Sequence, residues 1–263
     1  MISSMRQLLL RRDLIWSWAY RIVRARYQQS LLGGLWAIIQ PAATVLIFSV
    51  IFTVFVPVNT QGTPYMVFSY VAMVPWTLFS SSFSDMVESL VGNMNLVSKI
   101  YFPREILPIS SMLARLVDFA IAFCVIIIMM IYFQMKVYFL GWLLLPFILL
   151  VQILLALGLG LLGAALNVFY RDVRHLIALG LQLWFYASPI IYPISTVKDH
   201  LGAYYSLYFL NPMAGVLEAY RSVILYQQLP GSYIFLSSGV ALLLFLIGYW
   251  FFKRVEFQFA DVI

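Results

Sequence analysis

The sequence predicts an all-α integral membrane protein with six transmembrane helices, an N-terminal amphipathic interfacial helix, and a re-entrant helical hairpin between the last two spans. Of its 263 residues, 63% are hydrophobic and only 10% are charged. A soluble domain carries roughly 25% charged residues, because its surface faces water. Uncharged stretches at 27–84, 137–170 and 222–252 each exceed the roughly 20 residues that a helix needs to cross a membrane. Their continuous apolarity favours helices over the alternating strands of a membrane barrel.

The N-terminal segment 5–29 is predicted to form one amphipathic helix. Its apolar face consists of Leu14, Ile15, Trp18, Ile22 and Ala25. Arg21 and Arg24 fall on the opposite face, a pattern typical of a helix that lies in the membrane interface with its charges toward the lipid headgroups. A solvated helix packed on a partner protein is the alternative. No small-residue cleavage site follows this basic segment, so we expect no cleaved signal peptide.

The six predicted spans belong to a single membrane domain that covers residues 1–263. They lie at about 34–56, 66–92, 107–133, 142–168, 176–194 and 232–252. Between the last two spans, the segment 195–229 holds an apolar stretch that is short for a span and is interrupted by Asn211 and Pro212. We expect a re-entrant hairpin there, since irregular backbone is tolerated at membrane depth when protein covers it. A seventh full span is the alternative.

Positive charges are distributed unevenly over this topology. Six spans place both termini and the loops at 98–108 and 170–175 on one side, together with most arginines and lysines. The other side holds Lys136, Lys198 and Arg221. Cytoplasmic loops are enriched in Lys and Arg, so we expect both termini in the cytoplasm. This asymmetry accounts for the net charge of +6, and we expect contact with membrane lipid and no nucleic-acid partner.

The sequence contains no recognisable motif for catalysis, cofactor binding or metal binding. It lacks the G-x-x-x-x-G-K-[ST] pattern of a P-loop and the G-x-S-x-G pattern of a hydrolase. The histidines, His175 and His200, are predicted on opposite sides of the membrane, so we expect no two-histidine metal site. Cys124 is the only cysteine, which excludes an intrachain disulfide. We therefore expect a chain without enzymatic activity, and any nucleotide that energises it must be hydrolysed by another chain.

Four charged residues fall within predicted spans, where charges are costly and a functional role is the first expectation. Asp85 and Glu88 share a face of the second span, and Arg115 and Asp118 share a face of the third. In antiparallel helices joined near residue 101, Asp85 lies at a depth similar to that of Arg115 and Asp118. We favour an ion-paired strut between these helices; a gate or proton relay is the alternative.

Aromatic residues make up 17% of the chain, and several fall in the middle of predicted spans. Phe48 and Phe52 share a face of the first span, and Phe185, Ser188 and Tyr192 share a face of the fifth. These five residues are the candidate lining of a translocation pathway, and a stripe that faces lipid is the alternative.

Small residues recur every four positions in the fourth span. Ala156, Gly160 and Ala164 form a row on one face, which allows the backbone of another helix to approach closely. The pattern leaves open whether that helix belongs to the same chain or to a second copy.

Five sequence blocks, in this order, resemble those of a known family. They are RYQQSLLGGLWAIIQP (26–41), LVSKIYFPREILPIS (96–110), NVFYRDVRHL (167–176), SPIIYP (188–193) and LNPMAGVLEAYRS (210–222). Together they are similar to the permease subunits of ABC-2 exporters, and most similar to the group that exports O-antigen, teichoic acid and capsular polysaccharide across the bacterial inner (cytoplasmic) membrane. The resemblance extends over nearly the whole chain.

The resemblance implies a homodimer with two separate P-loop ATPase subunits, which would bind ATP and Mg in place of this chain. The substrate would be a lipid-linked polysaccharide. Residues 8–28 match the interfacial helix of the family, and 195–229 match its extracytoplasmic re-entrant helices. The residues that match its ATPase-coupling loops are Lys99, Ile100, Tyr101, Phe102, Pro103, Arg104 and Glu105 in the first loop, and Arg171 and Asp172 in the second.

Two other functions remain open from the sequence. An ABC-2 exporter of a lipid or drug would share the fold and carry a different cargo. A membrane glycosyltransferase or acyltransferase acting on polyprenyl-linked sugars would need an acid or base beside a substrate pocket. Outside the cytoplasm, the only candidates for that role are Asp199, His200 and Glu218. Co-purification with a P-loop ATPase would separate the exporter from the enzyme.

Overall fold

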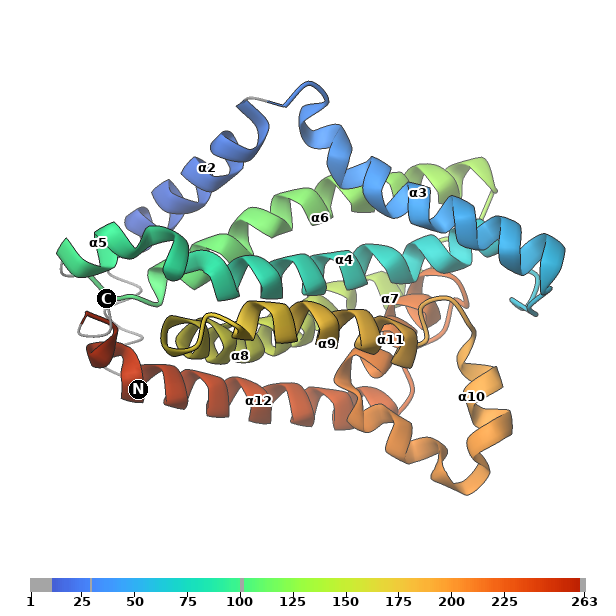
Figure 1. Ribbon diagram of the computed structural model, residues 1–263. Coiled ribbons are helices and arrows are strands. Elements are labelled where there is room, and N and C mark those ends of the chain that lie inside the picture. Colours follow the sequence, from blue (N-terminus) through green and yellow to red (C-terminus); the bar gives the residue numbers. More distant parts are fainter. Residues whose placement is uncertain (1–10, 29, 100–101, 261–263) are drawn as a thin grey trace.

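The computed structural model describes residues 11–28, 30–99 and 102–260, and every regular element within these ranges is helical. In Figure 1 the helices α4, α8, α9 and α12 run nearly parallel, while α3 and α6 cross them obliquely. The long helices are α3 (Trp36–Val50) with its flanking turns η1 (Gly33–Leu35) and η2 (Ile51–Phe55), α4 (Tyr65–Ser89), α6 (Ile106–Tyr132), α8 (Leu145–Phe169), α9 (Val173–Ala187) and α12 (Tyr233–Val255). The shorter elements are α2 (Arg12–Gln28), η3 (Val91–Asn93), α5 (Met94–Lys99), α7 (Phe139–Trp142), α10 (Ile194–Leu201), η4 (Gly202–Leu210), α11 (Pro212–Ile224) and η5 (Glu256–Ala260).

Among the residues that the structure describes, five helical segments are long and apolar enough to cross a membrane. They are Gly33–Phe55, Tyr65–Ser89, Ile106–Tyr132, Phe139–Phe169 and Tyr233–Phe259, which correspond to five of the six predicted spans. The span predicted at 176–194 is shorter in the structure, because α9 has only 15 residues and ends before Pro189 and Pro193. Proline lacks the N–H that would continue the helix. At 1.5 Å per residue, α9 is about 22 Å long, less than the roughly 30 Å hydrocarbon core.

Hydrogen bonds from α8 hold the buried helix α4 in place. The amide nitrogen Nδ2 of Asn167 donates to the carbonyl oxygen of Val87 (3.0 Å), and Nε2 of Gln152 donates to that of Pro75 (2.8 Å). Lipid gives helices no hydrophobic reason to associate, so interhelical hydrogen bonds and close packing stabilise the bundle.

The row of small residues in α8 is buried within this chain. Ala156 and Ala164 are fully buried, and a Cβ atom at Gly160 would overlap the side chain of Met86 in α4. The neighbouring helix therefore belongs to the same chain, which answers the question that the sequence leaves open.

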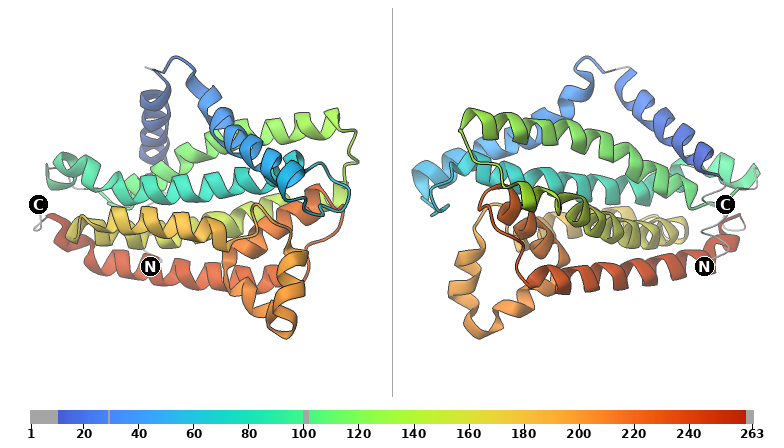
Figure 2. Two further views of the ribbon diagram at one scale, coloured as in Figure 1. Left: turned by 45° about the vertical axis from the view of Figure 1, so that its right-hand side comes forward. Right: turned by 180° about the vertical axis from the view of Figure 1, so that it is seen from behind.

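The helix α2 is steeply inclined to the bundle and packs on α6 (Figures 1 and 2). The hydroxyl of Ser110 in α6 donates to the carbonyl oxygen of Ile15 (3.1 Å). The packed face differs slightly from the predicted apolar face, since Ala19 is buried while Leu14 and Ala25 are exposed.

The segment between α9 and α12 divides into an inner and an outer part. All 13 residues of α11 are buried, because this helix packs against α4, α8 and α12. The helix α10 and the turn η4 project sideways from the end of the bundle (Figure 2). The predicted hairpin at 195–229 thus contains three helical elements.

Candidate functional site

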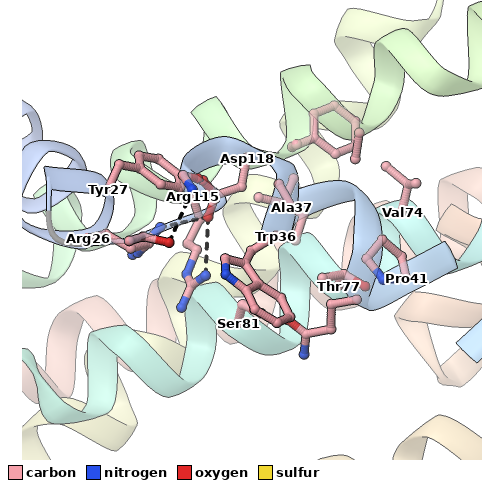
Figure 3. Close-up of a pocket in the computed structure, with 16 residues that line it drawn as sticks. Arg26, Tyr27, Trp36, Ala37, Pro41, Val74, Thr77, Ser81, Arg115 and Asp118 are labelled. Atoms are coloured by element: carbon pink, nitrogen blue, oxygen red, sulfur yellow. Dashed lines mark hydrogen bonds and ion pairs between the residues drawn. The ribbon is translucent and has the colours of Figure 1, made fainter. Parts of the chain in front are cut away.

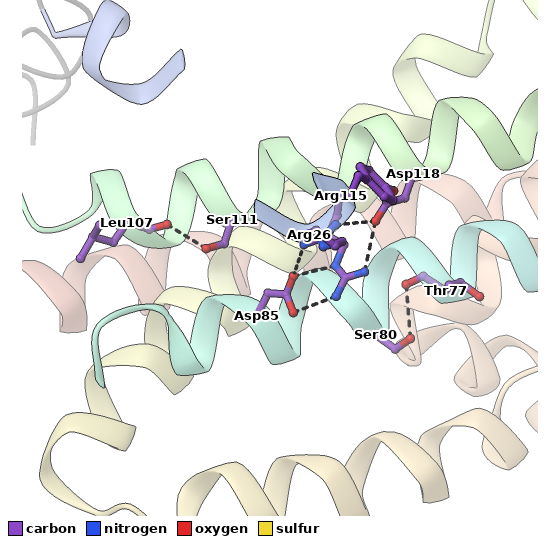
Figure 4. A network of polar contacts seen from close by, with 9 residues as sticks. Arg26, Thr77, Ser80, Asp85, Leu107, Ser111, Arg115 and Asp118 are labelled. Atoms are coloured by element: carbon purple, nitrogen blue, oxygen red, sulfur yellow. Dashed lines mark hydrogen bonds and ion pairs between the residues drawn. The ribbon is translucent and has the colours of Figure 1, made fainter. Parts of the chain in front are cut away.

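Two arginines and two aspartates from three helices form an ion network (Figure 4). Arg115 of α6 donates to Asp85 of α4 through Nε (2.6 Å) and Nη2 (2.9 Å), and to Asp118 through Nη1 (3.1 Å). Arg26 of α2 donates to the same carboxylates, at 2.9 Å to Asp85 and 2.6 Å to Asp118. The network is electrically neutral and joins α2, α4 and α6.

Of the charged residues that the sequence places in spans, the network includes Asp85, Arg115 and Asp118 but not Glu88. Glu88 is exposed on α4 and makes no ion pair with the residues that the structure describes. Arg26 is missing from the predicted set, because its partners lie 59 and 92 residues away in sequence. The predicted spans contain three carboxylates and only one arginine. This imbalance is the signal that could have indicated a further cation beside them.

Tyr27 adds a hydrogen-bond donor to the network. Its hydroxyl donates to Oδ1 of Asp118. Burial, and next the neighbouring Asp118 carboxylate, raise the pKa of Tyr27 to about 12. The hydroxyl therefore keeps its proton at neutral pH and remains a donor.

A cavity of about 270 Å³ lies beside the network, between α2, α3, α4 and α6. Figure 3 shows Arg26 and Tyr27 at one side of the cavity, and Pro41 and Val74 at the opposite side. Polar groups come from Arg26, Tyr27, Ser30, Gln40, Thr77, Ser81, Arg115 and Asp118. The remaining lining consists of Gly33, Trp36, Ala37, Pro41, Val74, Leu78, Phe119 and Ala122. The sequence gives no sign of this cavity, because its walls come from four helices that are separated in sequence.

Three of the five candidate pathway residues belong to one aromatic cluster. The ring of Phe48 lies 6.1 Å from both Phe52 and Phe185, measured between centroids. Phe185 also contacts Trp76 of α4 at 5.7 Å. All three phenylalanines are half-buried, so α3, α4 and α9 share a continuous aromatic face.

Ser188 and Tyr192 bond instead to the segment that precedes α11. The amide of Asn211 donates to Oγ of the buried Ser188 (3.0 Å), and the hydroxyls of Tyr192 and Tyr208 lie 3.1 Å apart. The predicted stripe therefore divides into a ring cluster and a hydrogen-bonded group after α9.

Arg221 of α11 is fully buried, although the sequence places it among the charges of an extracytoplasmic loop. Its guanidinium lies 3.7 Å from the ring centroid of Phe68 and donates to the carbonyl oxygens of Pro189 and Ile190. These contacts fix the turn after α9 to α4 and α11. Hydropathy and charge cannot reveal them, because the carbonyl partners belong to the backbone of a distant loop.

The first predicted coupling loop lies at one end of the bundle, with the turn between α8 and α9 and with η5 (Figure 1). Lys99 ends α5, and the predicted residues Ile100 and Tyr101 lie outside the described residues. Phe102 and Pro103 are half-buried, and Phe102 packs against the core.

The next two coupling residues face the C-terminal end of α12. Glu105 is fully buried and accepts a hydrogen bond from Nζ of Lys253 (3.1 Å). Arg104 donates to the carbonyl oxygen of Glu256. Both residues thus bind within the chain, whereas Arg171 and Asp172 are exposed in the second loop.

Comparison with known proteins identifies the family. Residues 13–225 match the model of the ABC-2 type transporter family. The chain is 32% identical over 231 residues to the O-antigen export system permease protein RfbA of Myxococcus xanthus, with 88% of this chain and 87% of the relative covered. A Klebsiella pneumoniae protein of the same name is 26% identical over 242 residues, with 92% and 91% covered. The polysialic acid transport protein KpsM of Escherichia coli is 27% identical over 233 residues, with 84% and 82% covered. The chain belongs to the ABC-2 type transporter family.

Proposed function

We propose that this chain is the permease subunit of an ATP-driven exporter, which moves a lipid-linked polysaccharide of O-antigen, teichoic acid or capsule type across the bacterial cytoplasmic membrane. The observation that carries the proposal is the similarity, over most of the chain, to proteins named for O-antigen export and polysialic acid transport. The sequence has no P-loop, so ATP and Mg bind to a separate ATPase subunit.

In the proposed topology, α9 and the turn after it form the fifth of six spans, and both termini are cytoplasmic. The parallel packing of α9 on α4 and α8 supports its inclusion in the membrane. The complete burial of α11 supports a re-entrant segment, because backbone that does not span is tolerated at membrane depth under a protein cover. Exposed Trp16 and Tyr20, next to the exposed Arg21 and Arg24, support an interfacial position for α2.

The cytoplasmic end of the bundle is the proposed docking surface for the ATPase. It carries the loop 99–105 and the exposed Arg171 and Asp172. Because Lys253 bonds Glu105, a force applied to this loop acts on α12 as well as on α6. Two copies of the chain, each with one ATPase subunit, complete the proposed exporter, and the aromatic face of α3 and α9 lines its pathway.

Purification from native membranes in a mild detergent tests this function. We expect a P-loop ATPase to co-purify in an amount equal to that of the permease. Replacing the exposed Arg171 and Asp172 with alanine should weaken this association without unfolding the permease. Lys136→Ala, at an exposed position at the opposite end, is the matched control and should have no effect. A chain that purifies alone and transfers sugar or acyl groups would contradict the proposal.

A further inference from the structure

The charge of the cavity beside the ion network restricts what can bind there. Arg26, Arg115 and Asp118 line the cavity, whereas Asp85 does not. Each arginine contacts both Asp85 and Asp118, so both positive charges at the cavity are already paired within the network. An anionic ligand would have to separate arginines from carboxylates to gain a counter-ion, and opening such a partly buried pair is costly. The lining therefore favours an uncharged ligand.

The polar groups of the cavity suit a ligand that both donates and accepts hydrogen bonds. Carboxylate and amide oxygens of Asp118 and Gln40 can accept, while guanidinium and hydroxyl groups can donate. A backbone acceptor adds to these, because Pro41 has no N–H to bond the carbonyl oxygen of Ala37, and both residues line the cavity. Hydroxyl groups are the uncharged groups that meet both demands.

The cavity lining includes the exposed aromatic ring of Trp36. Trp36 is 53% exposed although it lines the cavity, so one part of its ring remains free for a ligand. Sugars combine hydroxyl groups at their edges with apolar C–H faces, and such a face can lie on an indole ring. A volume of about 270 Å³ is at the small end of ligand sites, which suits one sugar ring rather than a whole lipid.

The position of the cavity along α3 also suits a site that a sugar reaches early in export. Trp36 and Gln40 are near the start of this helix, beside α2, and Phe48 of the aromatic face follows Trp36 by about 18 Å of helix. A sugar that arrives at the interfacial helix therefore meets the cavity before the aromatic face.

We infer that the cavity between α2, α3, α4 and α6 is a binding site for an uncharged sugar ring of the exported glycan. The inference rests on the proposed export function and names the part of the substrate that this chain recognises.

Three photoreactive probes with the same alkyl tail test the inference on the full exporter in lipid nanodiscs. One probe carries glucose, one carries a phosphate and one ends in a hydroxyl group. We expect the glucoside to label residues 26–41 and 74–81 several-fold more strongly than the other two probes. Trp36→Ala should reduce glucoside labelling about tenfold, as loss of a well-packed aromatic contact does. Trp16→Ala is the matched control, since Trp16 is 65% exposed on α2 outside the cavity lining, and it should change nothing.

Two results would overturn the inference. Equal or stronger labelling by the phosphate would show an anion site, which the positive end of the helix dipole at the start of α3 would favour. Equal labelling by the alcohol would show a groove for lipid tails. ATP-dependent glycan export, measured on the same preparation, separates the two proposals. Export without selective labelling would contradict only the sugar site. Selective labelling without export would support a sugar site and contradict the proposed export function.

Discussion

At the level of single residues, Arg26 and Arg115 bind the same two carboxylates. This sharing determines how much stability the protein loses when one arginine is replaced. In Arg115→Leu, Arg26 still contacts Asp85 and Asp118, but the group becomes negative at membrane depth. Removing one partner of a fully buried pair costs about 3–5 kcal/mol, and we expect roughly 2–3 kcal/mol here because Arg26 remains and the side chains are partly exposed. Asp118→Asn should cost less, since its amide oxygen still accepts a hydrogen bond.

Reversible unfolding of the detergent-solubilised protein with SDS measures these differences. The double variant, with Arg26 and Arg115 both replaced by leucine, should lose more stability than the two single variants together, because it leaves both carboxylates unpaired. An Arg115→Leu protein that is as stable as the wild type but does not transport would favour the gate over the strut.

Glu218 should make stability depend on pH. Its carboxyl group is buried in α11, and oxygen Oε2 has no hydrogen-bond partner among the residues described. Burial raises the pKa of Glu218 to about 7, although the nearby Arg221 opposes the rise. Folding therefore favours the protonated acid, whose stabilisation is complete below the unfolded-state pKa near 4.5 and is lost as the pH rises through about 7.

Glu218→Gln keeps the shape and stays neutral, so it should raise the free energy of unfolding at pH 8 by about 2–3 kcal/mol. The difference from the wild type should disappear near pH 4. Thermal unfolding across this pH range measures the effect, with the exposed Asp199→Asn as control. An unchanged pH profile would mean that Glu218 is ionised at neutral pH in the folded protein.

The sequence predicts those ionic contacts that follow from local geometry. The three-residue spacing of Arg115 and Asp118, and the similar distances from the loop to Asp85 and Arg115, place three network members together. The contribution of Arg26 depends on how α2 packs on α6, and the bonds of Arg221 depend on the backbone of the turn after α9. Both are tertiary contacts, which periodicity in the sequence does not predict.

At the level of elements, the contact between α8 and α12 depends on glycines. A Cβ atom at Gly158 would lie 2.6 Å from Cα of Phe245, and one at Gly248 would overlap the carbonyl group of Gly158. Gly248→Ala should therefore force the helices apart and lower the free energy of unfolding by about 1–3 kcal/mol. Gly239→Ala is the matched control in α12, where the added Cβ atom meets no atom within 4 Å. SDS-induced unfolding of both variants checks this, and equal stabilities would contradict the close approach.

Hydropathy predicts the long helices well and the segment between the last two spans poorly. Five predicted spans correspond to long apolar helices, because each carries its own apolar run. The fifth predicted span ends early at its prolines, and α11 is buried despite containing Glu218 and Arg221. Burial of such a mixed helix is decided by its neighbours α4, α8 and α12, which a window along the sequence does not include.

For the whole molecule, the aromatic face predicts a pathway between two copies of the chain. Cysteines at Phe48, Phe52, Phe185 and Tyr192 should react with small water-soluble thiol reagents while the ATPase turns over. Leu246, which is 42% exposed on α12, should stay protected by lipid. The exposed native Cys124 must first be replaced by serine. Equal protection at all five positions would mean that the aromatic face contacts lipid.

ATP-dependent glycan transport in proteoliposomes tests the central claim most directly. The permease and its co-purified ATPase are reconstituted with the ATPase facing outward, and a lipid-linked polysaccharide is added to the outer leaflet. We predict that ATP makes the glycan resistant to an added glycosidase, because it moves into the lumen, and that a non-hydrolysable ATP analogue does not. Glycan that stays sensitive to the glycosidase, while the same vesicles transport a lipid or drug without sugar, would contradict a polysaccharide exporter.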